Sequence, residues 1–182
     1  ASKVTDLIGN TPMLKLKMKN NDWNVFLKLE KFNPGGSMKD RMALNMIEEA
    51  EKSGQLKPGG TIIESSSGNT AIGLAIASAI KGYHFIAVVD HHASKEKIDM
   101  IKAYGAEIVV VGDGYKANEV AVIEREKTAK RMSEEMENAF FPNQADNFNN
   151  RAAYIDTLAD ELLNDITTIN SLYAAIGTGG SA

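Results

Sequence analysis

The sequence predicts an α/β fold built on parallel sheets. Short runs of β-branched and apolar residues alternate with segments of helical composition through the middle of the 182-residue chain. The runs are apolar at every position rather than at alternate positions, which is typical of strands covered on both faces. These two observations favour doubly wound parallel sheets in which a helix connects successive strands.

The middle of the chain supplies three strands and three helices. In order, they are expected at Thr61–Glu64, Thr70–Lys81, Phe85–Val89, Ser94–Tyr104, Ile108–Val111 and Ala117–Glu137. The first two helices are each followed by a glycine, Gly82 and Gly105, a residue that readily ends a helix. Ser94 is a suitable N-cap for the second helix.

The flanks add four elements. A strand is expected over Asn24–Glu30, a helix from Ser37 to about Ser53, an amphipathic helix over Arg151–Asn164 and a strand over Ser171–Ile176. The last strand runs straight into the glycine-rich segment Gly177–Ser181, a turn that normally leads into a helix. We therefore expect the chain to be a fragment or a processed piece of a larger protein.

Composition excludes several functional classes. Hydrophobic residues make up 43% and charged residues 24%, the values of an ordinary globular protein. The net charge is −4 and the basic residues are dispersed, so no nucleic-acid groove or anionic-membrane surface is expected. The longest apolar runs, such as Ile108–Val111, are too short for a membrane span. The chain has no cysteine, which excludes disulfides, thiolate nucleophiles and cysteine metal ligands. With no apolar signal region at Ala1–Val4, a cytoplasmic location is the default expectation.

The strongest local motif is Asn-Pro-Gly-Gly-Ser-Met-Lys-Asp-Arg at Asn33–Arg41. Ser37 is a good N-cap, and Asp40 completes a capping-box pattern three residues later. Lys39 then lies in the first helical turn, where the helix dipole disfavours a cation. If this lysine is also desolvated, its pKa falls and it can act as an amine nucleophile. The alternative is an exposed lysine on a capped helix.

A second motif, Glu-Ser-Ser-Ser-Gly-Asn-Thr at Glu64–Thr70, lies between a strand and an Ala-rich helix. Serine hydroxyls and the first backbone N–H groups of the helix converge there, which suits a carboxylate or phosphate. An ordinary Ser/Asn-rich helix cap is the alternative. A serine hydrolase is poorly supported, because the segment lacks Gly-x-Ser-x-Gly and has no neighbouring histidine.

The third motif is Gly-Thr-Gly-Gly-Ser at Gly177–Ser181. Small residues after a strand allow several backbone N–H groups to point at one phosphate. No Gly-Lys-Ser/Thr follows, so this is not a Walker loop, and a plain turn is the alternative.

Two other segments favour no site. Gly112–Ala117 fits a dinucleotide-binding fingerprint, but the acids at the required distance, Glu134 and Glu135, fall within the long expected helix. Asp90-His91-His92 ends a strand, but adjacent histidines usually diverge and no third ligand is evident. No metal site is therefore expected.

Taken together, the motifs resemble the N-terminal half of a pyridoxal-phosphate enzyme of the cysteine synthase and cystathionine β-synthase family (fold type II, the tryptophan-synthase-β-like group). The resemblance begins at Leu7–Met13 and runs to the last residues, and includes Lys28–Glu30 and Tyr104–Ala106. The order and spacing of these segments make it specific.

The resemblance implies a role for each motif. Lys39 would hold the aldehyde of pyridoxal 5'-phosphate as an internal Schiff base and later act as acid and base at the substrate Cα. Asn69 would hydrogen-bond the ring hydroxyl of the cofactor. The substrate α-carboxylate would be bound by Ser66, Ser67, Gly68, Thr70 and Gln144. The cofactor phosphate would be cradled by Gly177, Thr178, Gly179, Gly180 and Ser181.

The resemblance also implies an architecture and partners. Residues 38–145 would form a small mobile lobe, inserted in a large cofactor-binding lobe of which residues 1–37 and 146–182 are the visible part. The large lobe would be incomplete. The expected partners are a small-molecule amino-acid substrate and a second copy in a homodimer.

The implied reaction is β-replacement on an O-activated serine, O-acetylserine or O-phosphoserine, with sulfide or a thiol. Alternatives are a 2,3-diaminopropionate-type synthase, a Ser/Thr dehydratase, and a truncated non-catalytic binding or regulatory module. The chain departs from the family pattern at Met38, Phe148–Arg151, Tyr154 and Leu158–Glu161. These departures leave the substrate pair open.

Overall fold

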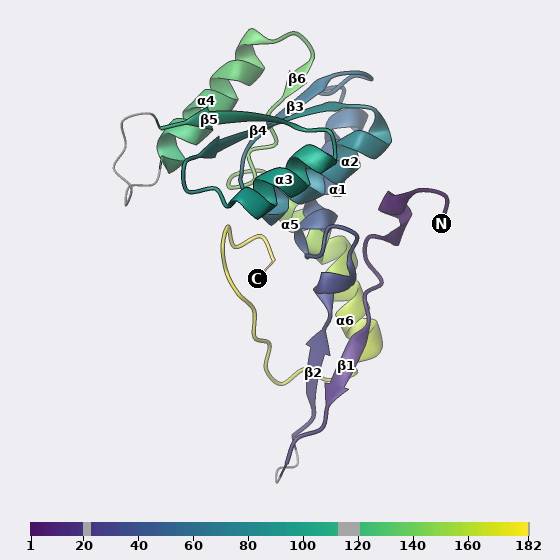
Figure 1. The fold of residues 1–182 in the computed structure, drawn as a ribbon. Helices are drawn as coiled ribbons and strands as arrows, with labels where there is room; N and C mark the ends of the chain where they lie inside the picture. Colours follow the sequence, from purple (N-terminus) through teal and green to yellow (C-terminus); the bar gives the residue numbers. More distant parts are fainter. Residues whose placement is uncertain (20–22, 113–120, 182) are drawn as a thin grey trace.

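The computed structural model describes residues 1–19, 23–112 and 121–181. Its main body is a four-stranded parallel sheet with strand order β5-β4-β3-β6 (Figure 1). These strands are β3 (Thr61–Ser65), β4 (His84–Asp90), β5 (Glu107–Val111) and β6 (Ala139–Phe140). The helices between and before them are α1 (Lys39–Lys52), α2 (Asn69–Lys81), α3 (Lys95–Ala103) and α4 (Val122–Glu135).

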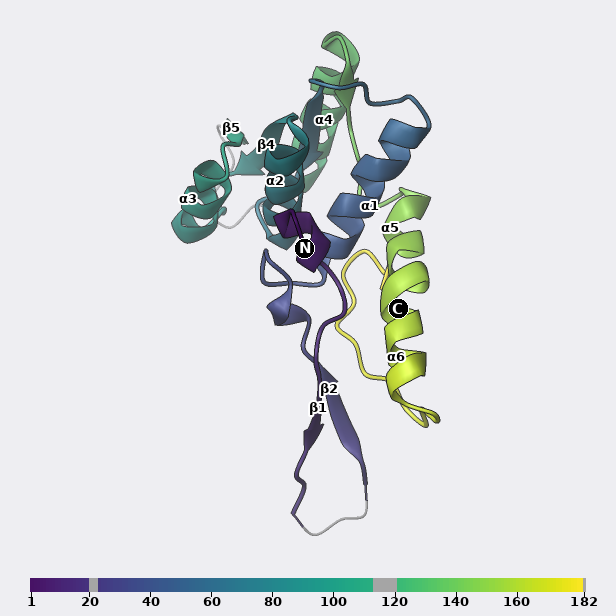
Figure 2. The same cartoon turned by 90° about the vertical axis from the view of Figure 1, so that its right-hand side faces the viewer.

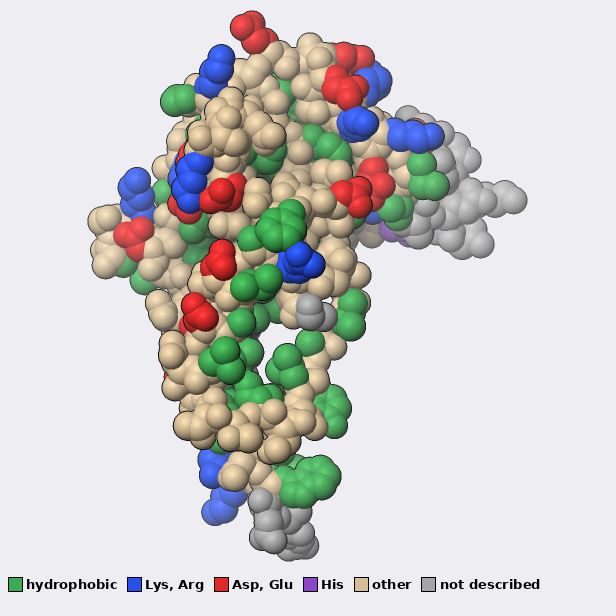
Figure 3. Space-filling model, turned by 180° about the vertical axis from the view of Figure 1, so that it is seen from behind, with side chains coloured by type: hydrophobic (Ala, Val, Ile, Leu, Met, Phe, Trp, Pro, Cys, Tyr) green, Lys and Arg blue, Asp and Glu red, His purple; other side chains and the backbone are tan. Residues whose placement is uncertain are grey.

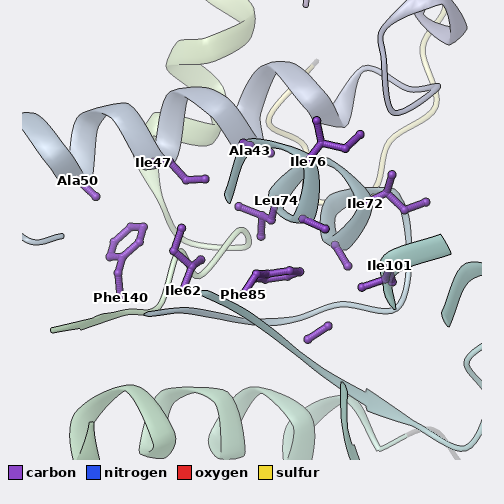
Figure 4. Packing of buried hydrophobic residues seen from close by; sticks show 14 of the residues in the cluster. Ala43, Ile47, Ala50, Ile62, Ile72, Leu74, Ile76, Phe85, Ile101 and Phe140 are labelled. Carbon is purple, nitrogen blue, oxygen red and sulfur yellow. The ribbon is translucent and has the colours of Figure 1, made fainter. Parts of the chain in front are cut away.

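Adjacent residues of β3 bury their side chains on opposite faces of the sheet. Ile62 packs with Phe85 beneath α1 and α2, in the cluster drawn in Figure 4. Ile63 belongs to a second cluster that contains Ile86 of β4 and Ala129 of α4. Because both faces are covered, the strands are apolar throughout, as the sequence predicted. The doubly wound α/β architecture is confirmed.

A second part of the molecule projects from the sheet body. It contains the antiparallel hairpin of β1 (Met13–Leu16) and β2 (Val25–Lys28), which extends away from the body in both ribbon views (Figures 1 and 2). A helical run follows β6: α5 (Phe148–Ala153), the π-helical turn η3 (Tyr154–Ala159) and α6 (Asp160–Asp165). Two short 3-10 helices, η1 (Val4–Leu7) and η2 (Glu30–Phe32), complete the described elements.

Two contacts fix the helical run against the sheet body. Met42 and Met46 of α1 pack against Ala153, Tyr154 and Leu158 in a small apolar cluster. The guanidinium of Arg41 also lies between two carboxylates, at 2.8 Å from Glu30 and 2.6 Å from Glu161. Helix α1 therefore serves as the common support for both parts of the molecule.

The predicted elements of the middle are confirmed within a residue or two at most ends. The expected helix over Ala117–Glu137 is described from Val122 onward, and its first residues lie outside the described ranges. So do residues 113–117 of the dinucleotide-like motif. Ser94 caps α3, its hydroxyl oxygen accepting the N–H of Lys97.

The strand predicted over Ser171–Ile176 is wrong. These residues form no regular secondary structure and are exposed. A strand requires the backbone hydrogen bonds of a neighbour, and no strand among the described residues lies beside this segment. The helix predicted over Arg151–Asn164 exists, but it starts earlier, at Phe148, and contains the π-helical turn. Within the described ranges, no helix has the length and apolarity to cross a bilayer.

Candidate active site

Lys39 is the first residue of α1. Its backbone N–H donates to Ser37 Oγ at 3.1 Å, and its side chain is half-buried. Burial lowers the pKa of the Lys39 amine, and no carboxylate in the described parts of the chain lies within ion-pair distance of it. The sequence left open whether this lysine is desolvated or exposed, and the half-buried position gives an amine with an increased neutral fraction.

The capping box predicted for Ser37 and Asp40 is wrong. The Asp40 carboxylate accepts the N–H of Gly35 at 2.5 Å, because the loop before the helix folds back over it. A Cβ at Gly35 would lie 2.4 Å from Asp40 Oδ1, so this position requires glycine. Burial raises the pKa of Asp40 to about 6, against the opposing effect of the Gly35 N–H. Asp40 thus fixes the loop that leads into Lys39.

Gly73 brings α2 against the first turn of α1. A Cβ built on Gly73 would lie 3.0 Å from the Cβ of Ala43 and 3.2 Å from the carbonyl oxygen of Lys39. Gly73 is one turn after Asn69, so this close approach places the start of α2 beside the start of α1. Lys39 and the serine-rich segment are therefore neighbours across a helix pair.

The serine-rich segment connects β3 to α2. Ser66 and Thr70 are buried, Ser67 and Gly68 are half-buried, and Asn69 is exposed. Gly68 is the N-cap of α2, and no side chain caps this helix. The first N–H groups of α2 are therefore left for another acceptor, as expected of an anion-binding segment.

Gln144 meets this segment from 74 residues away in the sequence. The Thr70 hydroxyl donates to Gln144 Oε1 at 2.6 Å, and the backbone N–H of Gln144 donates to Glu64 Oε2 at 3.1 Å. Glu64 is 1% exposed and also accepts the N–H of Ser65 at 2.7 Å. Burial raises the pKa of Glu64 to about 8, although both N–H groups oppose this rise. The structure thus joins Thr70 and Gln144, two residues that the resemblance predicts to bind the same carboxylate.

The glycine-rich segment Gly177–Ser181 reaches the same region through Asn150. Asn150 Nδ2 donates to the carbonyl oxygen of Gln144 at 2.7 Å and to Thr178 Oγ1 at 3.0 Å. Sequence reasoning missed Asn150 and the anchoring role of Glu64. Asn150 lies within Phe148–Arg151, a stretch where the chain departs from the family pattern, so the resemblance gave it no role.

Other predicted residues are not joined by direct bonds. Asn69 and the Lys39 amine make no hydrogen bond to the other candidate residues that are described.

A hollow of about 400 Å³ lies elsewhere, between α1 and the η3–α6 run; its lining includes Asn10, Arg41 and Asp156 but not Lys39. The described residues contain no cluster of three or more His, Asp or Glu side chains that could hold a metal ion.

Known proteins are similar to this chain in sequence and in fold. A Sinorhizobium fredii (strain NBRC 101917 / NGR234) relative with a provisional cysteine synthase name is 48% identical, over 98% of this chain and 53% of the relative. The cysteine synthase of Staphylococcus aureus (strain Mu50) is 43% identical, over 98% of this chain and 57% of the relative. This chain therefore spans little more than half the length of these curated relatives.

Solved structures are also similar to this chain. The O-acetylserine dependent cystathionine β-synthase of Helicobacter pylori has a TM-score of 0.88 and 34% identity, over 100% of this chain and 59% of that chain. O-ureido-L-serine synthase has a TM-score of 0.80 and 37% identity, over 91% of this chain and 51% of that chain. Residues 4–182 match the family described as pyridoxal-phosphate dependent enzymes. This match covers nearly the whole chain and agrees with the amine and the two anion-binding segments, so the chain belongs to the pyridoxal-phosphate dependent enzyme family.

Proposed function

We propose that this chain binds pyridoxal 5'-phosphate through Lys39 and supports β-replacement on an O-activated serine. The single observation that carries the proposal is the Lys39 amine: half-buried, without an ion-pair partner among the described residues, and lowered in pKa by burial. A neutral amine is the form that attacks an aldehyde. The relatives named as cysteine synthases support this reaction class.

The residues present fit this cofactor. Lys39 supplies the amine, and the uncapped N-terminus of α2 supplies donors for an anion. In the glycine-rich segment, a Cβ at Gly180 would lie 2.5 Å from Asn150 Oδ1, so a side chain at this position would have to displace the Asn150 amide. Gly177, Thr178, Gly179, Gly180 and Ser181 would hold the phosphate, and Asn69 the ring hydroxyl.

When bound, the cofactor supplies an electron sink that makes the substrate Cα proton removable. The Lys39 amine accepts that proton, since its lowered pKa keeps part of it neutral. The substrate α-carboxylate is held by Ser66, Ser67, Gly68, Thr70 and Gln144. The bound cofactor would thereby let the activated oxygen leave Cβ as acetate or phosphate, and sulfide or a thiol would bond to that carbon in its place.

Covalent trapping tests the cofactor proposal. The chain is incubated with pyridoxal 5'-phosphate, reduced with borohydride and mapped by peptide mass spectrometry. We expect the added mass on the peptide that contains Lys39. Lys39→Ala should lose the adduct while keeping its circular dichroism spectrum. Lys52→Ala, which removes an exposed lysine at the other end of α1, is the matched control. An unlabelled Lys39 in the wild-type protein would reject the proposal.

Product analysis tests the reaction. O-acetylserine, O-phosphoserine and serine are each offered with sulfide and with homocysteine. Cysteine formed from an O-activated serine and sulfide is the expected product. Pyruvate without a new Cβ bond would instead identify a dehydratase. In a parallel reaction with ammonia in place of sulfide, diaminopropionate would identify the related synthase. Trapping without any turnover would identify a non-catalytic binding module.

The remaining expectations are predictions. They comprise the small lobe at residues 38–145, the large-lobe parts at 1–37 and 146–182, a homodimer and a cytoplasmic location. The dimer is tested by sedimentation equilibrium of the chain with cofactor.

A further inference from the structure

Asn150 is a buried amide that connects two segments far apart in the sequence. It lies in α5, is 2% exposed, and uses both hydrogens of its side-chain amide. One bonds to the carbonyl oxygen of Gln144 at 2.7 Å, and the other bonds to Thr178 Oγ1 at 3.0 Å. A single side chain thus fixes the distance between Gln144 and the glycine-rich segment.

The helix that carries Asn150 is itself anchored to the helix that begins with Lys39. Asn45 Nδ2 of α1 donates to the carbonyl oxygen of Asn149 at 2.9 Å, and Ala153 packs against Met42 and Met46. Asn150 is therefore held by the same helix that positions the Lys39 amine.

Stability alone does not account for an asparagine at this position. Its Oδ1 is buried and has no hydrogen-bond partner within residues 1–19, 23–112 and 121–181, and a buried polar atom without a partner costs free energy. This oxygen faces Gly180, the point where an added Cβ would approach it to 2.5 Å. The amide is thus retained at a cost, next to the segment that it orders.

We propose that Asn150 is a positioning residue that couples the carboxylate-binding side of the site, through Gln144, to the phosphate-binding segment, through Thr178. The proposal deepens the proposed function and rests on it for the identity of the two ligand groups. Without these bonds, only a weakly packed segment would follow Ile176, because residues 171–178 are exposed. With them, the glycine-rich segment is ordered before any ligand binds.

The first test uses the cofactor-free chain. Backbone order parameters of Gly177, Gly179 and Gly180 are measured by ¹⁵N relaxation. The wild type should be ordered, whereas Asn150→Ala and the nearly isosteric Asn150→Asp should fall below about 0.6, the range of flexible backbone. Asn149→Ala is the matched control, since the Asn149 side chain makes no hydrogen bond with any residue that the structure describes. Equal order parameters in all four proteins would overturn the proposal.

The second test uses pyridoxal 5'-phosphate. Asn150→Ala and Thr178→Val should each weaken cofactor binding about 3- to 10-fold, the range expected for a lost hydrogen bond. Asn150 and Thr178 share one hydrogen bond, so their losses of cofactor affinity should not add. The double variant should bind the cofactor about as weakly as Asn150→Ala alone. The ³¹P resonance of the bound cofactor should shift in Asn150→Ala and stay unchanged in Asn149→Ala.

The outcomes separate the two proposals. A wild-type chain that fails to bind the cofactor would reject the proposed function, while the order parameters would still decide whether Asn150 orders the segment. Strictly additive losses, or an unchanged ³¹P resonance, would overturn the coupling even if Lys39 is trapped as expected.

Discussion

Three ionisable side chains near the site, Lys39, Asp40 and Glu64, have pKa values moved toward their neutral forms. Burial is the largest cause in each case. Their partners differ: Lys39 has no ion pair among the described residues, whereas Asp40 and Glu64 each accept backbone N–H groups. Asp40 and Glu64 therefore stabilise loops, whereas the Lys39 amine remains available to react.

Glu64 should make stability depend on pH. Its folded pKa of about 8 lies above the ordinary value of 4.5, so its contribution is complete below pH 4.5 and is lost as pH rises through 8. Asp40, whose folded pKa of about 6 is also raised, adds a further loss of stability as pH rises to about 6. We expect the unfolding free energy to fall between pH 6 and 8 in the wild type and to fall less in Glu64→Gln.

Urea denaturation at pH 5, 6.5 and 8.5 measures this difference. Glu137→Gln, which changes an exposed carboxylate, should retain the wild-type slope. Parallel pH profiles for the wild type and Glu64→Gln would show that Glu64 does not titrate in this window.

At the scale of elements, α1 is the support on which the site depends. It begins with Lys39, contacts α2 through Gly73, and holds the η3–α6 run through Arg41. Lys28 extends the ionic group, at 2.7 Å from Glu161. These contacts fix the direction of α1 and thereby the position of its first residue.

Gly73→Ala should destabilise the protein, although alanine is the better helix former. The added methyl group would lie 3.0 Å from the Ala43 Cβ and 3.2 Å from backbone atoms of α1, so the two helices must separate. Overpacking of this kind costs about 1–3 kcal/mol. Chemical denaturation measures the loss of unfolding free energy. Ala79→Gly, on the exposed face of α2, is the control, because it changes helix propensity alone, by about 1 kcal/mol. A stabilised Gly73→Ala would contradict the close contact.

Arg41→Met should be more damaging. Removing the guanidinium leaves Glu30 and Glu161 facing each other with a large part of their charge uncompensated. Breaking a buried ion pair costs about 3–5 kcal/mol. Thermal unfolding measures the effect, and Lys52→Ala, which breaks the exposed pair with Glu49, should leave the midpoint unchanged. An equal midpoint for Arg41→Met and the wild type would show that the network is not required.

At the scale of the whole molecule, apolar side chains remain exposed on the part that projects from the sheet. Figure 3 shows apolar side chains over the lower part of the face it presents. The exposed large apolar residues of the chain include Trp23, Leu163, Leu172, Tyr173 and Ile176. Tyr173 is 92% exposed. Exposed apolar side chains promote association and dye binding.

Replacing Leu172, Tyr173 and Ile176 together by serine should reduce the binding of an apolar fluorescent dye. The unfolding free energy should change by less than about 0.5 kcal/mol per site, because Leu172, Tyr173 and Ile176 are 64%, 92% and 71% exposed. Dye fluorescence and urea denaturation of the same samples measure both effects. A large loss of stability would show that this segment packs against the protein.

The sequence by itself determined the α/β class, the helix that begins beside Lys39, and the three motifs, because apolar runs, glycines and helix caps act over a few neighbouring residues. It did not determine that Ser171–Ile176 lacks strand structure, or that Asp40 bonds to Gly35 rather than Ser37. Nor did it identify Asn150 and Glu64 as the side chains that join Gln144 to its neighbours. Those features depend on backbone groups brought together from distant positions, and only the packing of α1 against α2 and α5 decides which donor faces which acceptor.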